Sequence, residues 1–299
     1  MKKEDYRVKP EAGMQVTATI ERQAPFGYFL SVEGQDILLH QSDAEGELEI
    51  GEQVEVFLYH DHQDRIAATQ HEPYITLGEF GWLEVKDVHP RMGVFLDNGI
   101  RKDLLLPADQ LPEIKSKWPR SGDRVYVELE HDKQGRMLAV LGREENFEQI
   151  AVPAEQDSFN KDITGYVYKV IKIGAFLLTE GQHLAFIHRD ETDEPLRVGQ
   201  RVEGRISKVR DDGRVNVTTK LRKEVSYSQD AEMIYDYIKN RGGRMPYTDK
   251  TDPDIIKEKF GISKAAFKRA LGKLMKERRA HQEEGWTILS EKNSKKSAE

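Results

Sequence analysis

The sequence contains no cysteine among its 299 residues. The absence of thiols excludes disulfide bonds, cysteine nucleophiles and cysteine-ligated zinc, and it agrees with a reducing cytoplasm. No apolar run approaches the length that a membrane-spanning helix needs. The first residues are charged and lack the apolar core and cleavage site of a signal peptide. We therefore expect a cytoplasmic protein with no membrane segment.

The patterns that usually carry catalysis are also missing. The sequence has no glycine-rich phosphate loop, no nucleophile elbow and no paired carboxylates in an apolar setting. His60, His62 and Asp64 imitate the start of a metallohydrolase ligand motif, but Arg65 stands where that motif needs another histidine. We therefore expect no catalytic residues, no metal and no cofactor, and so no enzyme.

Charge is unevenly distributed along the chain. The whole sequence has a net charge of −7, which argues against a protein that coats nucleic acid non-specifically. Residues 225–299 carry 16 Lys and Arg against 12 Asp and Glu, a net +4, whereas residues 1–224 carry 30 against 41, a net −11. The basic surplus therefore lies in the C-terminal quarter.

Three segments repeat one pattern around a Gly-x-aromatic core. The core reads Phe26-Gly27-Tyr28-Phe29-Leu30, then Met92-Gly93-Val94-Phe95-Leu96, then Ile173-Gly174-Ala175-Phe176-Leu177. A strand-like run precedes each core, and an apolar strand, a Gly-x-x-Val strand and a last strand after a charged turn follow it. This order of short alternating strands predicts small all-β Greek-key barrels of the OB type.

The uneven spacing of the cores favours separate domains in series over a solenoid. We expect barrels at residues 1–72, 73–144 and 145–222, with the second degenerate and the third preceded by a polar linker or short helix. Residues 291–299, rich in Ser, Lys and Glu, are expected to form a disordered tail.

Residues 223–290 change to helical periodicity. The first helix has apolar positions from Ala231 to Ile238, and the second follows an Asp252 N-cap with Ile255, Ile256 and Phe260 as its apolar stripe. The third helix begins at Lys264, and its expected interior residues are Phe267, Leu271, Leu274 and Met275. A hairpin at Trp286-Thr287-Ile288-Leu289 completes the pattern of an α+β winged helix.

The repeated segments resemble S1 domains, which are OB-fold modules that bind RNA. The first segment matches through Phe26-Gly27-Tyr28-Phe29, Leu39-His40-Gln41-Ser42 and Gly51-Glu52-Gln53-Val54. The third matches through Gly174-Ala175-Phe176-Leu177, Ile187-His188 and Asp212-Gly213-Arg214-Val215. The second departs, with Pro107 in place of the histidine and Met92 in place of the first aromatic.

The order of three such segments and a winged helix resembles the conserved virulence factor B family. The resemblance covers the chain except its tail and includes Phe260-Gly261-Ile262-Ser263-Lys264-Ala265-Ala266-Phe267-Lys268-Arg269-Ala270-Leu271. It implies an RNA-binding regulator of the expression of virulence factors and related genes.

The S1 resemblance implies an RNA-contact surface on the second and third strands of each barrel and at the turn before the last strand. Aromatic rings there would stack on bases, and cations would hold phosphates. The implied residues are Phe26, Phe29, His40, Asp61 and Arg65 in the first barrel, Phe95, Asp132 and Arg136 in the second, and Phe176, His188 and Arg214 in the third.

The first barrel has the most complete set, and the second is expected to be a spacer or interaction domain. Side chains alternate along a strand, so Tyr28 and Phe29 cannot both face RNA. A lone histidine at a strand end is more often solvated or capping than ligand-binding.

The third helix of the winged helix carries a basic series, and further cations lead into the wing. The residues concerned are Lys264, Lys268, Arg269, Lys273, Lys276 and Arg279. They fit a recognition helix in a nucleic-acid groove, and they equally fit an ordinary solvated face.

These observations favour a non-catalytic, monomeric protein that binds single-stranded RNA through its barrels and regulates gene expression after transcription. Duplex DNA is a second candidate partner. The alternative is a transcription regulator whose winged helix reads duplex DNA, with the barrels as protein-interaction modules.

Overall fold

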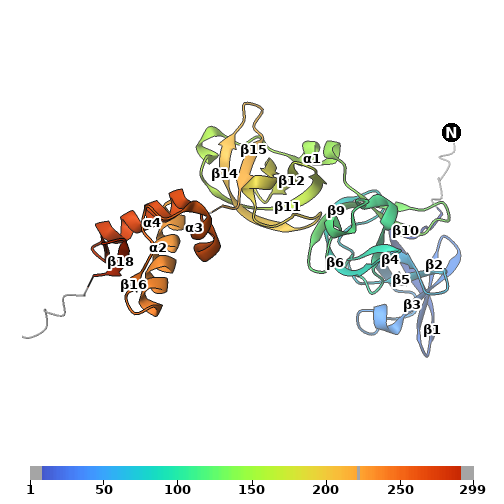
Figure 1. Ribbon diagram of the computed structural model, residues 1–299. Coiled ribbons are helices and arrows are strands. Elements are labelled where there is room, and N and C mark those ends of the chain that lie inside the picture. Colours follow the sequence, from blue (N-terminus) through green and yellow to red (C-terminus); the bar gives the residue numbers. More distant parts are fainter. Residues whose placement is uncertain (1–8, 221–222, 291–299) are drawn as a thin grey trace, which may run out of the picture. The chain divides into compact units, whose positions relative to one another are not determined.

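The computed structural model describes residues 9–220 and 223–290, with side chains of the second range described from residue 228 onward. The chain divides into two compact units, Met1–Lys220 and Leu221–Glu299 (Figure 1). The expected disordered tail lies outside the described residues. No described helix is long and apolar enough to cross a membrane.

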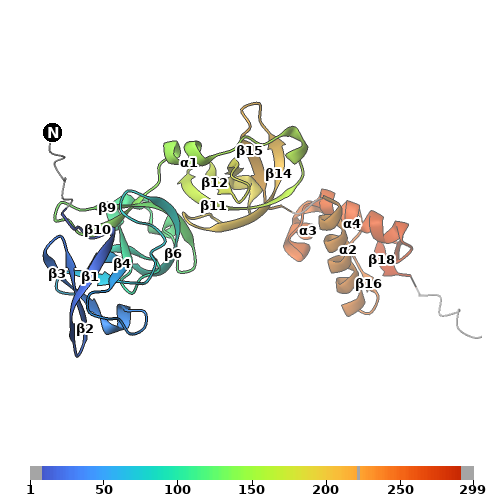
Figure 2. The same cartoon turned by 180° about the vertical axis from the view of Figure 1, so that it is seen from behind.

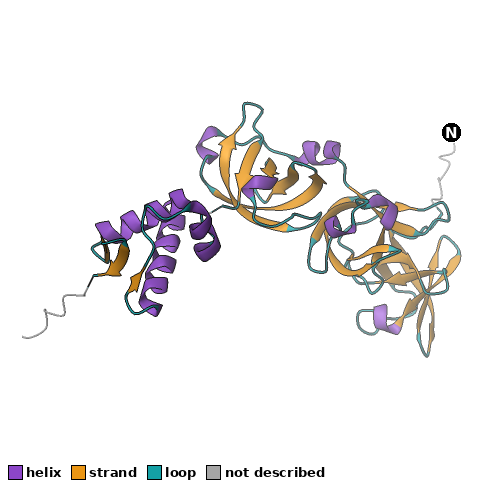
Figure 3. Ribbon diagram, viewed as in Figure 1, coloured by secondary structure: helices purple, strands orange, loops and turns teal. Residues whose placement is uncertain are grey.

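The first repeat folds into a closed five-stranded barrel, which confirms the predicted fold class (Figure 3). Its hydrogen-bonded order is β1-β2-β3-β5-β4. The strands are β1 (Gln15–Ala24), β2 (Gly27–Val32), β3 (Gln35–His40), β4 (Gln53–His60) and β5 (Ile66–Thr69). Tyr28 is buried and Phe29 only half-buried, which confirms that the two rings lie on opposite faces of β2.

The other two repeats have the same strand sequence. The third is a closed barrel of β11 (Asp162–Ile171), β12 (Gly174–Thr179), β13 (Leu184–His188), β14 (Arg201–Val209) and β15 (Val215–Thr218). The second is a sheet in the order β10-β9-β6-β7-β8, made of β6 (Phe80–His89), β7 (Gly93–Asp97), β8 (Leu104–Pro107), β9 (Arg124–His131) and β10 (Met137–Leu141). Its end strands, β8 and β10, lie close together.

The glycine of the repeated core is required by a close approach of two strands. Gly27 has φ +149°, and a β-carbon there would lie 2.2 Å from the Leu39 carbonyl oxygen. Gly93 has φ +129°, and its β-carbon would lie 2.0 Å from the Leu106 oxygen. Such distances are far below van der Waals contact, so only glycine fits. The motif therefore marks the point where strands 2 and 3 of each barrel meet.

The three barrels share buried residues, so they are not structurally independent domains. Phe57 of the first barrel is 1% exposed and belongs to the apolar core of the second. Asp123 of the second barrel accepts two hydrogen bonds of 2.7 Å from Arg197 of the third. These contacts explain why residues 1–220 form one compact unit although the sequence shows three domains.

A short helix, α1 (Glu144–Ile150), joins the second and third barrels and lies beside the third in both views (Figures 1 and 2). Its Phe147 is fully buried, and the Phe147 ring stacks on that of Tyr168 with centroids 4.0 Å apart. The same ring packs against Trp82 and Tyr126 of the second barrel. This helix is the expected connection before the third barrel.

The C-terminal unit is a winged helix, as predicted. Its helices are α2 (Lys223–Asn240), α3 (Pro253–Phe260) and α4 (Lys264–Lys276). The sheet, in the order β16-β18-β17, contains β17 (Ala280–Glu283), β18 (Trp286–Leu289) and the unpredicted two-residue strand β16 (Arg244–Met245). Asp252 and Ser263 cap α3 and α4 by accepting hydrogen bonds from Asp254 N and Ala266 N.

The prediction that Met275 and Ile255 lie in the core of this unit is wrong. Met275 is 38% and Ile255 41% exposed. The buried stripe of α4 instead runs through Phe267, Ala270, Leu271 and Leu274. Met275 follows Leu274 by one residue, a rotation of about 100° around the helix, so it falls beyond the edge of the stripe.

Candidate nucleic-acid interface

The first barrel presents an exposed phenylalanine beside a half-buried one whose ring carries a cation. Phe26, 48% exposed, precedes β2, and its ring meets that of Phe29 edge to face with centroids 6.1 Å apart. The Arg22 guanidinium lies 3.5 Å from the centre of the Phe29 ring and also pairs with Asp36 at 3.5 Å. Rings open to solvent beside a guanidinium suit the stacking of nucleic-acid bases.

Asp61 holds Arg65 in position at the turn before the last strand. Its Oδ1 accepts from the backbone N–H groups of Gln63 and Arg65 at 2.8 and 3.0 Å, and its Oδ2 accepts from Arg65 Nε and Nη2 at 2.9 and 2.7 Å. Burial raises the pKa of Asp61, but these hydrogen bonds outweigh burial and hold the pKa below its ordinary value. The carboxylate therefore orients Arg65, whose side chain stays 63% exposed.

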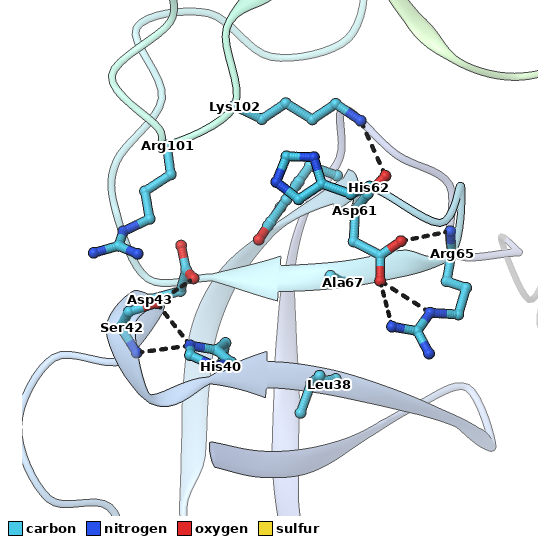
Figure 4. A pocket seen from close by; sticks show the side chains of 11 residues that line it. Leu38, His40, Ser42, Asp43, Asp61, His62, Arg65, Ala67, Arg101 and Lys102 are labelled. Atoms are coloured by element: carbon cyan, nitrogen blue, oxygen red, sulfur yellow. Dashed lines mark hydrogen bonds and ion pairs between the residues drawn. The ribbon is translucent and has the colours of Figure 1, made fainter. Parts of the chain in front are cut away.

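His40 is an exposed capping residue. Its Nδ1 accepts a hydrogen bond from the backbone N–H of Ser42 at 3.2 Å and lies 2.7 Å from Ser42 Oγ. The His40 side chain thereby caps the 3-10 turn η1 (Gln41–Asp43). The structure brings His40, Asp61 and Arg65 to one pocket (Figure 4). Phe29 is on the next strand, opposite the pocket residue Leu38.

The second barrel retains only part of this arrangement. Asp132 holds Arg136 as Asp61 holds Arg65, with 2.9 Å to the Arg136 backbone N–H and 2.8 Å to Nε. Phe95 is half-buried on β7 and faces Leu105 across the strands. Pro107 occupies the end of β8, where the other barrels place a histidine that caps the following turn.

The third barrel carries a row of rings that includes one residue the sequence analysis missed. Phe176 faces Phe186 across β12 and β13 with ring centroids 5.1 Å apart, and His188 continues the row at 6.4 Å from Phe186. Lys169 Nζ lies 5.7 Å from the Phe176 centroid. Phe186 occupies the position of Leu38 in the first barrel, directly across the strands from the phenylalanine of the repeated core. Aligning the third strands of the repeats would have identified it as a further ring on this surface.

Arg214 is oriented differently from its counterparts. Arg210 stands where Asp61 and Asp132 stand in the other barrels, so the turn offers no carboxylate at that position. Arg214 instead donates to Glu148 at 2.5 Å and to Glu144 at 3.4 Å, both on α1. Glu144 also accepts from Lys169 at 3.2 Å. Two cations of this surface are thus held by carboxylates of α1.

The basic residues of α4 differ in exposure. Lys268, Arg269 and Lys276 are exposed, whereas Lys264 and Lys273 are half-buried. Lys268 lies 3.9 Å from Asp249, and Lys273 donates to Ser228 of α2. The buried stripe of α4 faces the other way, so this side of the helix is open to a partner.

Arg279 is part of the framework of the winged helix. It forms a bidentate pair with Glu232, with Nη2 2.8 Å from Oε2, and its guanidinium lies 4.1 Å from the Tyr235 ring centre. The hydrogen bonds with Glu232 raise the pKa of Arg279 further. A cation–aromatic pair that the sequence analysis did not identify lies on the wing, where Arg244 is 5.2 Å from the centre of the exposed Trp286 ring.

The imitation of a metal motif forms no metal site within the described ranges, where no group of three or more His, Cys, Asp or Glu side chains is placed to hold an ion. His60 is half-buried, and burial followed by the charge of Lys102 lowers its pKa.

Four family models match the chain in succession. Residues 12–71 match an S1 domain, residues 80–140 the CvfB first S1-like domain, residues 147–221 the second domain of the virulence regulatory factor CvfB, and residues 232–289 the CvfB-like winged helix domain. The chain is therefore built of domains of nucleic-acid-binding types, none of them from a catalytic family.

Full-length relatives share this organisation. The chain is 45% identical to the protein YitL of Bacillus subtilis (strain 168), over 92% of both chains. It is 33% identical to conserved virulence factor B of Staphylococcus aureus (strain N315), over 87% of both. A Streptococcus pneumoniae crystal structure, described as a multidomain protein with nucleic acid binding domains, superposes with a TM-score of 0.63 at 34% identity, covering 93% of this chain and 98% of that one. The chain belongs to the conserved virulence factor B family.

Proposed function

We propose that this protein binds single-stranded RNA, chiefly through the first barrel, and regulates gene expression after transcription without catalysing a reaction. The observation that carries the proposal is the combination of exposed Phe26, half-buried Phe29 and an oriented Arg65 on one barrel. Base stacking on such rings contributes about 1–3 kcal/mol per base, and only unpaired bases expose their faces.

The three barrels support the proposal as a linked series. Each offers an aromatic on its second strand and an arginine at the last turn, and shared core residues hold them in one unit. A strand bound by one barrel is presented to the next at high effective concentration, so weak contacts combine. Because residues 1–224 have a net charge of −11, we expect a modest dependence on salt.

A second candidate function rests on the winged helix. The exposed Lys268, Arg269 and Lys276 on α4 fit a recognition helix that contacts duplex DNA. In that case the barrels would serve as protein-interaction modules.

Titration of labelled single-stranded RNA and duplex DNA distinguishes the two functions. The whole protein is compared with a truncated chain ending at Lys220, which retains one compact unit with its own apolar cores. RNA binding retained by the truncated chain supports the proposal. Tighter binding of duplex DNA that is lost on truncation contradicts it.

A further inference from the structure

A pocket of about 590 Å³ lies between the first barrel and the loop that precedes β8 of the second (Figure 4). Its volume is within the range of small-ligand sites. The first barrel supplies most of the lining, and the second supplies Arg101 and Lys102. In the close-up, Arg101 lies across the opening from Arg65, with Asp43 and Ser42 below it.

The loop of the second barrel is fixed against the first. Lys102 Nζ donates to the backbone carbonyls of His60 and Asp61 at 2.6 and 3.1 Å. Phe57, from the same strand as His60, is buried in the core of the second barrel. Arg101 is therefore held at the pocket by its neighbour although its own guanidinium is exposed.

Asp43 contributes a buried carboxylate to the lining of this pocket, and one of its two oxygens accepts no hydrogen bond from the described residues. The residue is 3% exposed. Its Oδ2 accepts from Ser42 Oγ at 3.1 Å, but Oδ1 has no hydrogen-bond partner among the described residues. A buried carboxylate oxygen without a donor is costly. The pocket thus offers an anionic acceptor that a ligand N–H group would satisfy.

We propose that this pocket holds one guanine nucleotide of the bound RNA, with the base on Asp43 and the flanking phosphates on Arg65 and Arg101. The assignment rests on the proposed RNA-binding function and names the base that the first barrel prefers.

The chemistry of the four bases points to guanine. Its Watson–Crick edge has two adjacent donors, N1–H and the 2-amino group. Adenine and cytosine place an acceptor nitrogen beside their amino group, and uracil places a carbonyl on each side of N3–H, so a carboxylate would repel part of each edge. Asp43 therefore favours guanine by charge as well as by hydrogen bonding.

Tyr59 and the two arginines of the pocket are compatible with a neutral base between flanking phosphates. Burial, followed by the charges of Asp43 and Asp61, raises the pKa of Tyr59 to about 12. Its hydroxyl is therefore protonated near pH 7. The Arg65 and Arg101 guanidiniums are the exposed cations at the rim and suit phosphates.

The test measures binding of the whole protein to an oligouridine of about ten nucleotides, with one central uridine replaced in turn by guanosine, inosine, adenosine or cytidine. We expect guanosine to raise the affinity about tenfold, and inosine, which lacks the 2-amino group, to raise it less. Asp43→Asn should reduce the preference, because the amide has no charge and offers one acceptor oxygen in place of two to the donors of guanine. The same variant should bind oligouridine at least as tightly as the unsubstituted protein, because the carboxylate that repels uracil is gone.

Arg101→Ala should weaken all oligonucleotides equally and lower the salt slope by about 0.7. Glu191→Gln, at the position of Asp43 in the third barrel, and Arg120→Ala, an exposed arginine outside the pocket, are the matched controls. Thermal unfolding establishes that each variant is folded, and the inosine comparison needs no variant.

The outcomes separate this inference from the function on which it rests. RNA binding without a guanine preference, or a preference that is undiminished in folded Asp43→Asn, overturns the guanine site and leaves the proposed function standing. Failure of every RNA to bind overturns both.

Discussion

Arg214 of the third barrel donates to Glu148 of α1 at 2.5 Å. In the first barrel the corresponding arginine, Arg65, is held by Asp61 within its own turn and remains open to solvent. The two arginines occupy the same turn of the same fold, but the Arg65 side chain is 63% exposed and the Arg214 side chain only 33%. Helix α1 therefore occupies two cations of the third barrel, Arg214 and Lys169, with its own carboxylates.

Removing the two α1 carboxylates is expected to strengthen RNA binding by the third barrel. The Glu144→Gln/Glu148→Gln variant releases Arg214 and Lys169 for phosphate contact. We expect a gain of about threefold in affinity for single-stranded RNA, measured by fluorescence anisotropy, because exposed ion pairs are weak. Glu145→Gln/Glu155→Gln changes the net charge equally and is the control. Equal gains in both variants would show a general charge effect and not a local one.

Loss of the aromatic pair in the first barrel is expected to weaken RNA binding strongly. Phe26→Ala/Phe29→Ala removes two stacking faces, each of which contributes about 1–3 kcal/mol. The affinity for RNA should fall at least tenfold while the fold, followed by circular dichroism, is unchanged. Phe159→Ala removes another exposed ring and should have no effect. Unchanged affinity in the double variant would exclude the first barrel from the site.

The charge of Asp61 should contribute stability that depends on pH. Because the hydrogen bonds hold its pKa below the ordinary value, this contribution is present above the unfolded-state pKa of about 3.9 and is lost as pH falls through the lower folded-state pKa. At pH 7, Asp61→Asn should lower the free energy of unfolding by about 1 kcal/mol, and the difference should shrink in acid. Urea unfolding measures both. Asp211→Asn, in the equivalent turn of the third barrel, serves as the control. A difference that does not shrink as the pH is lowered would contradict the assignment.

Substitutions in the winged helix should distinguish Arg279, which stabilises the fold, from exposed lysines of α4 that could contact nucleic acid. Arg279→Met breaks the pair with Glu232 and should lower the stability of this unit by about 1 kcal/mol, measured by thermal unfolding. Lys268→Ala/Lys276→Ala should leave stability unchanged and, if this unit binds duplex DNA, reduce that affinity and its salt slope. A larger loss of DNA affinity from Arg279→Met, without a loss of stability, would reverse these roles.

The sequence by itself determined the architecture, because the signals for it are local. Gly27 and Gly93 mark the crossing of two strands, and alternation along β2 separates buried Tyr28 from half-buried Phe29. The winged helix followed from its caps and apolar stripe. Positions at the edge of the stripe, such as Met275, were misassigned, because helical periodicity alone does not fix the width of the buried face.

The composition of each surface was decided only by the tertiary structure. Arg101 reaches the pocket of another barrel because Phe57 and Lys102 bind the two barrels together. Glu148 reaches Arg214 because Phe147 anchors α1 between two barrels. Such contacts arise from the burial of side chains far apart in the chain, and no local pattern of strands or helices encodes which loop meets which face.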